Sequence, residues 1–296
     1  MYKIFIIIFL NTLFSQVITD NSFNSSRSIA LAGATVSSPG GIESVFYNPA
    51  NLSNTTKTSF LIGKTRFYEQ NFLEHQYYSI LYHPTEKTNI ALTVQNLGTM
   101  TKDNTVSLSS EKSITISQGY ALLKDRNSSL RLGYNLSYFI LKQGDSAGPS
   151  GDGSDGIQGK TMNAFGIDIG VLATLRGKII MGAFIKNINS PKLGKGSNAQ
   201  FLPRRLDIGF SYLPIKKLKT SFVYERVLTA KNNQFRFGIE YELFKHFILR
   251  SGIQMKPNRL GFGFIASIND KSSFGYGVIS HHVLPLTHNV EIGFYF

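Results

Sequence analysis

Apolar and polar residues alternate strictly at the end of the chain. Four apolar residues occupy every second position there: Val290, Ile292, Phe294 and Phe296. A period of two indicates a β-strand with one apolar face and one polar or small face. An amphipathic strand that ends on phenylalanine is typical of bacterial outer-membrane barrels, in which the lipid face is apolar and the assembly machinery recognises the last strand. We therefore expect these four residues to form the assembly signal.

The same alternation recurs along most of the chain, between turn-forming residues. It predicts about fourteen strands, an even number, as in bacterial single-chain barrels. The expected strands cover residues 58–68, 72–82, 89–97, 112–123, 130–142, 161–175, 177–188, 202–213, 218–227, 233–243, 247–255, 259–268, 272–279 and 287–296. The pattern therefore predicts an all-β protein, a closed antiparallel transmembrane barrel over residues 57–296.

The lengths of the connections support this interpretation. Long connections follow only odd-numbered strands, at residues 98–111, 143–160, 189–201 and 280–286. Membrane barrels have short periplasmic turns and longer outer loops. A soluble β-sandwich or propeller would also alternate, but the strands are long and numerous and no fixed-period repeat is visible.

The N-terminus looks like a signal peptide. A short basic start precedes a nearly unbroken apolar run over residues 4–14, which is too short to span a bilayer as a helix. We expect cleavage between Ser15 and Thr19, so that residues 1–19 are the signal peptide. A buried N-terminal element is the alternative.

Composition narrows the chemistry. The chain has no cysteine, which excludes disulfides, thiolate metal sites, a cysteine nucleophile and a lipoprotein anchor. The formal charge of +13 comes from lysines and arginines spread over many connections. Anionic lipid headgroups are therefore the expected partner of these cations, and nucleic acid is not. Fourteen tyrosines and 23 phenylalanines can supply interfacial girdles in the absence of tryptophan.

Residues 20–56 do not have a strand pattern. A stretch of small apolar residues that includes Gly33 and Ala34 is followed by a break at Pro39 and by a second short segment that stops at Asn48-Pro49-Ala50. We predict two short helices or turns. Their small residues suit close packing inside the barrel, as a hatch.

Residues 28–36 and 46–52 together resemble the N-terminal signature of FadL-like outer-membrane barrels, and most of all their PorV/PorQ branch. The resemblance implies a fourteen-stranded barrel with an N-terminal hatch in the lumen, held through Gly33, Ala34, Asn48, Pro49 and Ala50. The family usually has a more acidic linker before Asn-Pro-Ala. Here that linker carries only Glu43.

The resemblance implies two alternative functions. PorV/PorQ-like members are accessory parts of type IX protein secretion and hold or transfer cargo proteins at the surface. FadL-like members let hydrophobic small molecules cross the outer membrane by lateral diffusion. The longest loop, 143–160, is polar and rich in glycine and offers nothing to hold an apolar tail. We therefore prefer the secretion role, with secretion components, cargo, outer-membrane lipid and the barrel assembly machinery as partners.

No catalytic or metal-binding set is apparent. Four charged residues on neighbouring strands are expected to face inward as a ladder of lumen salt bridges: Glu225, Arg236, Glu240 and Arg250. Asp145, Asp152 and Asp155 lack the register of a calcium loop. Histidines 281, 282 and 288 are expected to be solvated, and the glycines at 261 and 263 lie in a strand rather than before a helix. We predict a protein without cofactor, metal or enzymatic activity.

Overall fold

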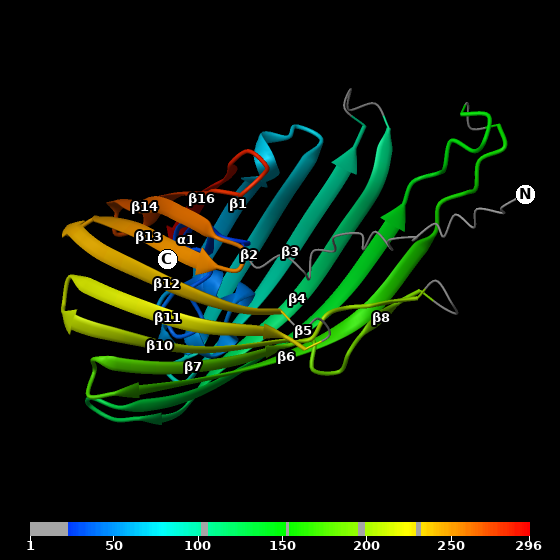
Figure 1. Cartoon of the computed structure of the whole chain (residues 1–296). Coiled ribbons are helices and arrows are strands. Elements are labelled where there is room, and N and C mark those ends of the chain that lie inside the picture. Colours follow the sequence, from blue (N-terminus) through cyan, green and yellow to red (C-terminus); the bar gives the residue numbers. More distant parts are fainter. Residues whose placement is uncertain (1–22, 102–105, 152–153, 195–198, 229–231) are drawn as a thin grey trace, which may run out of the picture.

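The structure, a computed structural model, describes residues 23–101, 106–151, 154–194, 199–228 and 232–296. The predicted signal peptide, 1–19, lies outside these residues. Within them, no helix has the length and apolar character needed to cross a bilayer. Fourteen strands form a closed antiparallel barrel around a short N-terminal segment (Figure 1).

The barrel strands follow one another around the wall in chain order, and the first pairs with the last. Their bounds are β1 (Ser59–Arg66), β2 (Leu73–Thr85), β3 (Thr88–Met100), β4 (Ser107–Lys124), β5 (Ser129–Gln143), β6 (Thr161–Leu175), β7 (Ile179–Lys186), β10 (Arg205–Ile215), β11 (Leu218–Val227), β12 (Asn232–Phe244), β13 (Phe247–Met255), β14 (Arg259–Asn269), β15 (Ser272–Ile279) and β16 (Thr287–Tyr295). The seam runs in register from Ser59 opposite Tyr295 to Arg66 opposite His288. The predicted closed barrel of fourteen strands is confirmed.

The two faces of the wall explain the alternation in the sequence. Along β10, Asp207, Gly209 and Ser211 are buried in the lumen, and the residues between them are exposed apolar or aromatic side chains. A closed barrel pairs every strand and so leaves no unsatisfied sheet edge in lipid. An apolar exterior around a polar interior is the pattern of a membrane-spanning barrel.

One predicted loop is wrong over most of its length. Residues 98–111 were expected to be a connection, but β3 continues to Met100 and β4 begins at Ser107. The first residues of β4 pair with the end of β5, with Ser109 opposite Gln143, so backbone hydrogen bonds extend both strands despite the serine-rich sequence. The wall is therefore taller at β4 to β6 than at β1 or β7, as Figure 1 shows.

The connection from β7 to β10 turns inward instead of extending outward. It contains a small hairpin of β8 (Lys192–Leu193) and β9 (Gln200–Phe201). The turn starts at Asn187 and includes Ser190, both with positive φ. Asn189 then takes the place of a strand residue beside β6, because its side-chain amide accepts from Ile167 N–H and donates to the Phe165 carbonyl.

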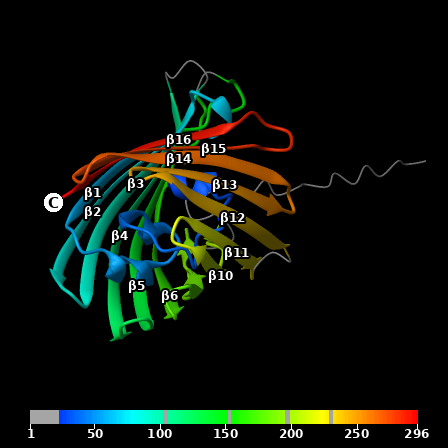
Figure 2. The same cartoon turned by 90° about the vertical axis from the view of Figure 1, so that its left-hand side faces the viewer.

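The described part of the N-terminal segment lies between the strands in both views (Figures 1 and 2). It contains one α-helix, α1 (Ser26–Ala30), and two 3₁₀ helices, η2 (Ile42–Phe46) and η3 (Pro49–Asn54). A further short 3₁₀ turn, η4 (Phe67–Glu69), links β1 to β2. The second segment ends before Pro49, as expected, because η2 stops at Phe46; Pro49 is then the first residue of a further helix, η3. Proline is favoured at that position, and the Asn48 side chain accepts from Ala50 N–H as the N-cap.

Candidate functional site: the occupied lumen

We call residues 23–56, the described part of the predicted hatch, the lumen segment. Its backbone follows inward-facing glycines around the wall. A Cβ atom added at any of these glycines would lie within 3.0 Å of the lumen segment: Gly119, Gly133, Gly170, Gly182, Gly209, Gly252, Gly261, Gly263, Gly275 and Gly277. Several are direct neighbours across strands, such as Gly133 beside Gly119 and Gly170. Because glycine has no side chain, these ten positions leave room for the lumen segment against the inner face of the wall, and we call them the glycine track.

Two of the predicted hatch residues lie on the part of the segment that faces β12. Gly33 has a φ of +81°, which favours glycine, and the Arg236 side chain packs against it. Ala34 is fully buried and its Cβ faces Gly238. Both small residues thus allow the close approach that the sequence suggested.

The other three predicted hatch residues bind the opposite side of the wall. Asn48 donates from its side-chain amide to the Val171 carbonyl on β6, 3.1 Å away. Pro49 and Ala50 lie over Gly133 of β5. Near the exit of the segment, the Asn89 side chain on β3 donates to the carbonyls of Leu52 and Thr55. The segment is therefore anchored at both of its ends.

A group of ion pairs centred on Glu240 ties the first half of the lumen segment to the wall. The Glu240 carboxylate accepts from Arg27 of α1 at 2.7 Å, from Lys219 of β11 at 2.5 Å and from Arg250 of β13 at 3.1 Å. Lys219 and Arg250 are the cross-strand partners of Glu240, which explains why they meet. Burial alone would lower the pKa of Arg27, but the carboxylates of Glu240 and Glu43 beside it raise that pKa above its usual value. Arg27 therefore stays charged inside the barrel.

A second group lies on the same side of the lumen. Glu225 on β11 pairs with Arg236 on β12 at 2.9 Å and with Arg205 on β10 at 3.4 Å, and Arg205 also contacts Asp207 at 3.1 Å. All four side chains are buried. Together the two groups cover strands β10 to β13, which we call the charged wall. Glu225, Arg236, Glu240 and Arg250, the four predicted lumen charges, all belong to it.

The last strand also binds the lumen segment. Glu291 on β16 accepts from the Ser26 backbone N–H at 3.0 Å and from its hydroxyl at 2.5 Å. Tyr77 on β2 donates to the same carboxylate at 2.7 Å. Ser25 completes the start of α1 as its N-cap, in a capping box with Ser28. The other face of β16 carries Val290, Ile292 and Phe294. These side chains are exposed, as expected of the lipid face. Phe296 follows β16, and its N–H donates to the Thr58 carbonyl.

The strands facing the charged wall have neutral polar side chains. On β2 to β5, which we call the neutral wall, hydroxyls and amides bind one another across strands. Ser79 pairs with Thr93 at 2.8 Å, Thr115 pairs with Ser137 at 2.9 Å, and Gln95 links His75 to Ser113. These contacts join uncharged groups, although the carboxylate of Glu111 on β4 is also buried on this wall.

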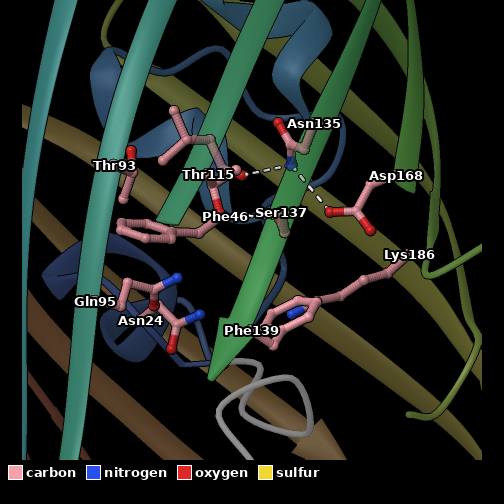
Figure 3. A pocket seen from close by; sticks show the side chains of 11 residues that line it. Asn24, Phe46, Thr93, Gln95, Thr115, Asn135, Ser137, Phe139, Asp168 and Lys186 are labelled. Atoms are coloured by element: carbon pink, nitrogen blue, oxygen red, sulfur yellow. Dashed lines mark hydrogen bonds between the residues drawn. The ribbon is translucent and has the colours of Figure 1, made fainter. Parts of the chain in front are cut away.

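A cavity of about 20 Å³ lies between the neutral wall and the lumen segment (Figure 3). Eight of its eleven lining residues are polar: Asn24, Thr93, Gln95, Thr115, Asn135, Ser137, Asp168 and Lys186. The others are Val45, Phe46 and Phe139. Asn135 bridges the two sides, because its amide donates to the Val45 carbonyl at 3.0 Å and to Asp168 at 3.1 Å. This volume fits about one water molecule and no larger ligand.

Apolar clusters lie on both sides of this cavity. Towards the long loops, Phe139, Leu141, Met162 and Ala164 pack against Leu193 and Leu202 from the inward-turned connection, and we call this group the mouth cluster. On the other side, Val45 and Phe46 of the lumen segment pack with apolar residues of β1, β2 and β3. The eight polar residues that line the cavity, which we call the polar collar, thus lie between two apolar regions.

The remaining candidates do not form sites. His288 lies near Glu69 at 3.4 Å and His281 stacks on His282. Asp155 binds Ser150 within its own loop, Asp145 accepts from Gly159 N–H, and Asp152 lies outside the described residues. Among the described residues, no cluster of three or more metal-ligating side chains is found. The predicted absence of metal and cofactor stays a prediction.

Sequence reasoning missed several residues that organise the lumen. Arg27, Lys219 and Glu291 hold the segment, and Leu193 and Leu202 complete the mouth cluster. Lys219 could have been found from its position opposite Glu240. Arg27 and Leu193 lie outside the predicted strands. Leu202 was the first residue of the predicted strand 202–213, but β10 begins only at Arg205, and the alternating pattern carries no sign of the contact between Leu202 and the mouth cluster.

Comparison with known proteins places this fold. No protein-family model and no curated protein matches the sequence. Among solved structures, the toluene transporter TbuX of Ralstonia pickettii has a TM-score of 0.62 at 13% identity, covering 92% of this chain and 98% of its own. The monoaromatic hydrocarbon channel CymD has a TM-score of 0.63 at 12% identity, with 92% and 97% covered. A Pseudomonas aeruginosa FadL homologue has a TM-score of 0.57 at 8% identity, with 92% and 98% covered.

The chain has the fold of FadL-type outer-membrane barrels. The closed barrel with its apolar exterior places the protein in an outer membrane, as expected. The expected membership of the PorV/PorQ branch is not established by these likenesses and stays a prediction.

Proposed function

We propose that the protein is a non-enzymatic channel through which small hydrophobic molecules cross the outer membrane. The observation that carries this proposal is the mouth cluster, a group of apolar side chains packed together inside a polar lumen, which a solute can enter when these side chains separate. The similar solved structures, described as toluene and monoaromatic hydrocarbon transporters, support the same substrate class. A surface of this kind concentrates an apolar solute by removing it from water.

This proposal reverses the preference drawn from the sequence. The secretion role was preferred because loop 143–160 has no apolar surface. The structure builds that surface from another connection, through Leu193 and Leu202, and both side chains are buried against β5 and β6. The argument against hydrophobic passage therefore fails.

We further propose that residues 20–56 plug the resting channel. The described part of this segment is almost fully buried in the lumen and is held at both ends. The cavity beside it is too small for an aromatic ring, so transport requires part of the segment to move. Residues 39–41 and 43 are the part of the segment before η3 that is only partly buried, and we propose that this link between the two anchors is the part that moves.

Uptake of radiolabelled toluene tests the proposal. Cells that express the protein are compared with cells that carry the variant Leu193→Asp/Leu202→Asp and with cells that lack the barrel. We expect the wild type to raise initial uptake above the barrel-free host and the variant to lose that gain, because buried acids repel the solute from the mouth. Val283→Asp is the matched control, since Val283 lies exposed in another outer loop.

Heat-modifiable migration on semi-native gels confirms that all variants are folded. Wild-type uptake equal to that of the barrel-free host would refute transport of this substrate class.

A further inference from the structure

The polar collar contains hydrogen-bonding capacity that its own residues do not use. Thr115 and Ser137, which are cross-strand partners, bind one another through their hydroxyls. Two hydroxyls carry two hydrogens, and one such bond uses a single hydrogen. The pair makes no other hydrogen bond among the described residues, so one O–H remains free to donate.

An unused acceptor lies on the same face of β5. Asn135 is 2% exposed and donates twice through its amide nitrogen, but its side-chain oxygen has no partner among the described residues. A buried polar atom without a partner is costly, and such atoms are rare. The collar thus offers one donor and one acceptor on adjacent inward positions of one strand, Ser137 and Asn135.

Two phenyl rings flank these groups. Phe46 comes from the lumen segment and Phe139 from the mouth cluster, and both line the same cavity (Figure 3). A ring that enters from the mouth meets Phe139 first. It reaches the polar groups when the link around residues 39–47 gives way, and the only hydrogen bond from the neutral wall to that link is the one from Asn135 to Val45 among the described residues.

We propose that the collar is a selectivity site for small neutral aromatic molecules that carry a hydroxyl group. A hydroxyl both donates and accepts, so it can donate to the Asn135 oxygen and accept from the Thr115–Ser137 pair, while the ring packs against Phe139. A plain hydrocarbon leaves both groups unpaired. This inference rests on the proposed function and refines its substrate class from hydrocarbons in general to phenols.

Three compounds with the same methyl-substituted ring test the inference: toluene, 4-methylphenol and 4-methylbenzoate. Initial uptake above that of the barrel-free host is measured for each. We expect 4-methylphenol to enter about tenfold faster than toluene, the effect of two neutral hydrogen bonds. The benzoate is expected to enter most slowly, because its charge must be removed from water and Asp168 lies in the lining.

The variant Thr115→Val/Ser137→Ala removes both hydroxyls at nearly constant shape. It should reduce the preference for 4-methylphenol over toluene severalfold and leave toluene uptake unchanged. Thr115→Ser keeps the hydroxyl pair and should keep the preference. Ser117→Ala is the matched control, because Ser117 is a buried serine on the same strand outside the cavity lining.

The outcomes separate the two proposals. Equal uptake of toluene and 4-methylphenol by the wild type, or an unchanged preference in the double variant, overturns the selectivity site while transport stands. Fastest uptake of the benzoate overturns it in favour of an anion site at Lys186. If none of the three compounds enters faster than in the barrel-free host, the proposed function itself fails. If the double variant does not assemble, calorimetric titration of the purified wild type compares 4-methylphenol with benzyl methyl ether, which has no hydroxyl group. Tighter binding of 4-methylphenol supports the selectivity site, and equal binding of the two compounds overturns it.

Discussion

The charged wall and the neutral wall hold the same lumen segment by different means. On β10 to β13, Glu240 gathers three cations, one of them from the segment. On β2 to β5, hydroxyls and amides bind mainly one another, and the cavity lies on this side. Buried ion pairs are costly to break one partner at a time, whereas neutral groups exchange partners more easily. The contrast divides the lumen into a side held by ion pairs and a side held by neutral groups, and under the proposed function we expect a neutral solute to pass along the second.

The largest effect is expected at the seam, because neither wall exists without it. Replacing Phe296 by aspartate places a charge at the end of the last strand and should block insertion of the barrel. Surface levels measured by protease shaving and by heat-modifiable migration should fall to background. Phe201→Asp, an equally drastic change at an exposed outer-loop residue, is the control. Normal surface levels of the Phe296 variant would show that this residue is no assembly signal.

Removing the segment that both walls hold should have the next largest effect. Deletion of residues 25–47 takes away α1, η2 and the link, and leaves the polar lumen open to water. We expect stepwise conductance in planar bilayers from the deletion variant and almost none from the wild type. Deletion of residues 146–151 in an exposed loop is the control. Equal conductance with and without residues 25–47 would mean that the segment does not plug the barrel.

One substitution on each wall compares how much the two walls contribute to the free energy of unfolding. Glu240→Gln keeps the shape but removes the carboxylate that Lys219, Arg250 and Arg27 share, leaving only Arg27 with another, Glu43, and should cost about 3–5 kcal/mol. Gln95→Leu on the neutral wall removes two hydrogen bonds and should cost about 1–3 kcal/mol. Urea unfolding in lipid vesicles measures both. Equal shifts of the midpoint would remove the distinction between the two sides.

The smallest effects concern the glycine track, which both walls share. Gly252→Ala and Gly133→Ala each place a Cβ within 3.0 Å of the backbone of the lumen segment. Overpacking of this kind costs about 1–3 kcal/mol. We expect brief conductance bursts from both variants. Gly98→Ala is the control, since nothing lies within 4 Å of the added atom. If neither glycine variant shows any conductance, the segment shifts without opening the lumen.

The sequence predicted the strands of the barrel far better than the contacts of the segment and the connection that lie inside it. Lipid outside and polar groups inside impose alternation on every strand, so positions such as Ile208 and Gly209 reveal their faces locally. The contacts of Arg27, Leu193 and Leu202 depend on residues far away in the chain, and no local pattern encodes them. Residues 98–111 were expected to be a connection, but pairing with β5 carries β4 back to Ser107, and β3 continues to Met100.

The inward glycines show the same limit. Each looks in the sequence like any small residue on the polar face of a strand. Their common purpose becomes visible only when neighbouring strands bring them side by side and the N-terminal backbone lies on top. The lumen charges on β11 to β13 could be grouped beforehand because cross-strand neighbours follow from the strand order, and Glu240 with Arg250 is one such pair.

The bond between Glu291 and Ser26 joins α1 to the last strand of the barrel. The same strand therefore both closes the ring, through its pairing with β1, and holds the segment, through Glu291. We expect closure of the ring and capture of the segment to be coupled, so that assembly leaves no open pore. Glu291→Gln, followed by dye release during assembly into vesicles, measures this coupling, and release no greater than that of the wild type would show that the two events are independent.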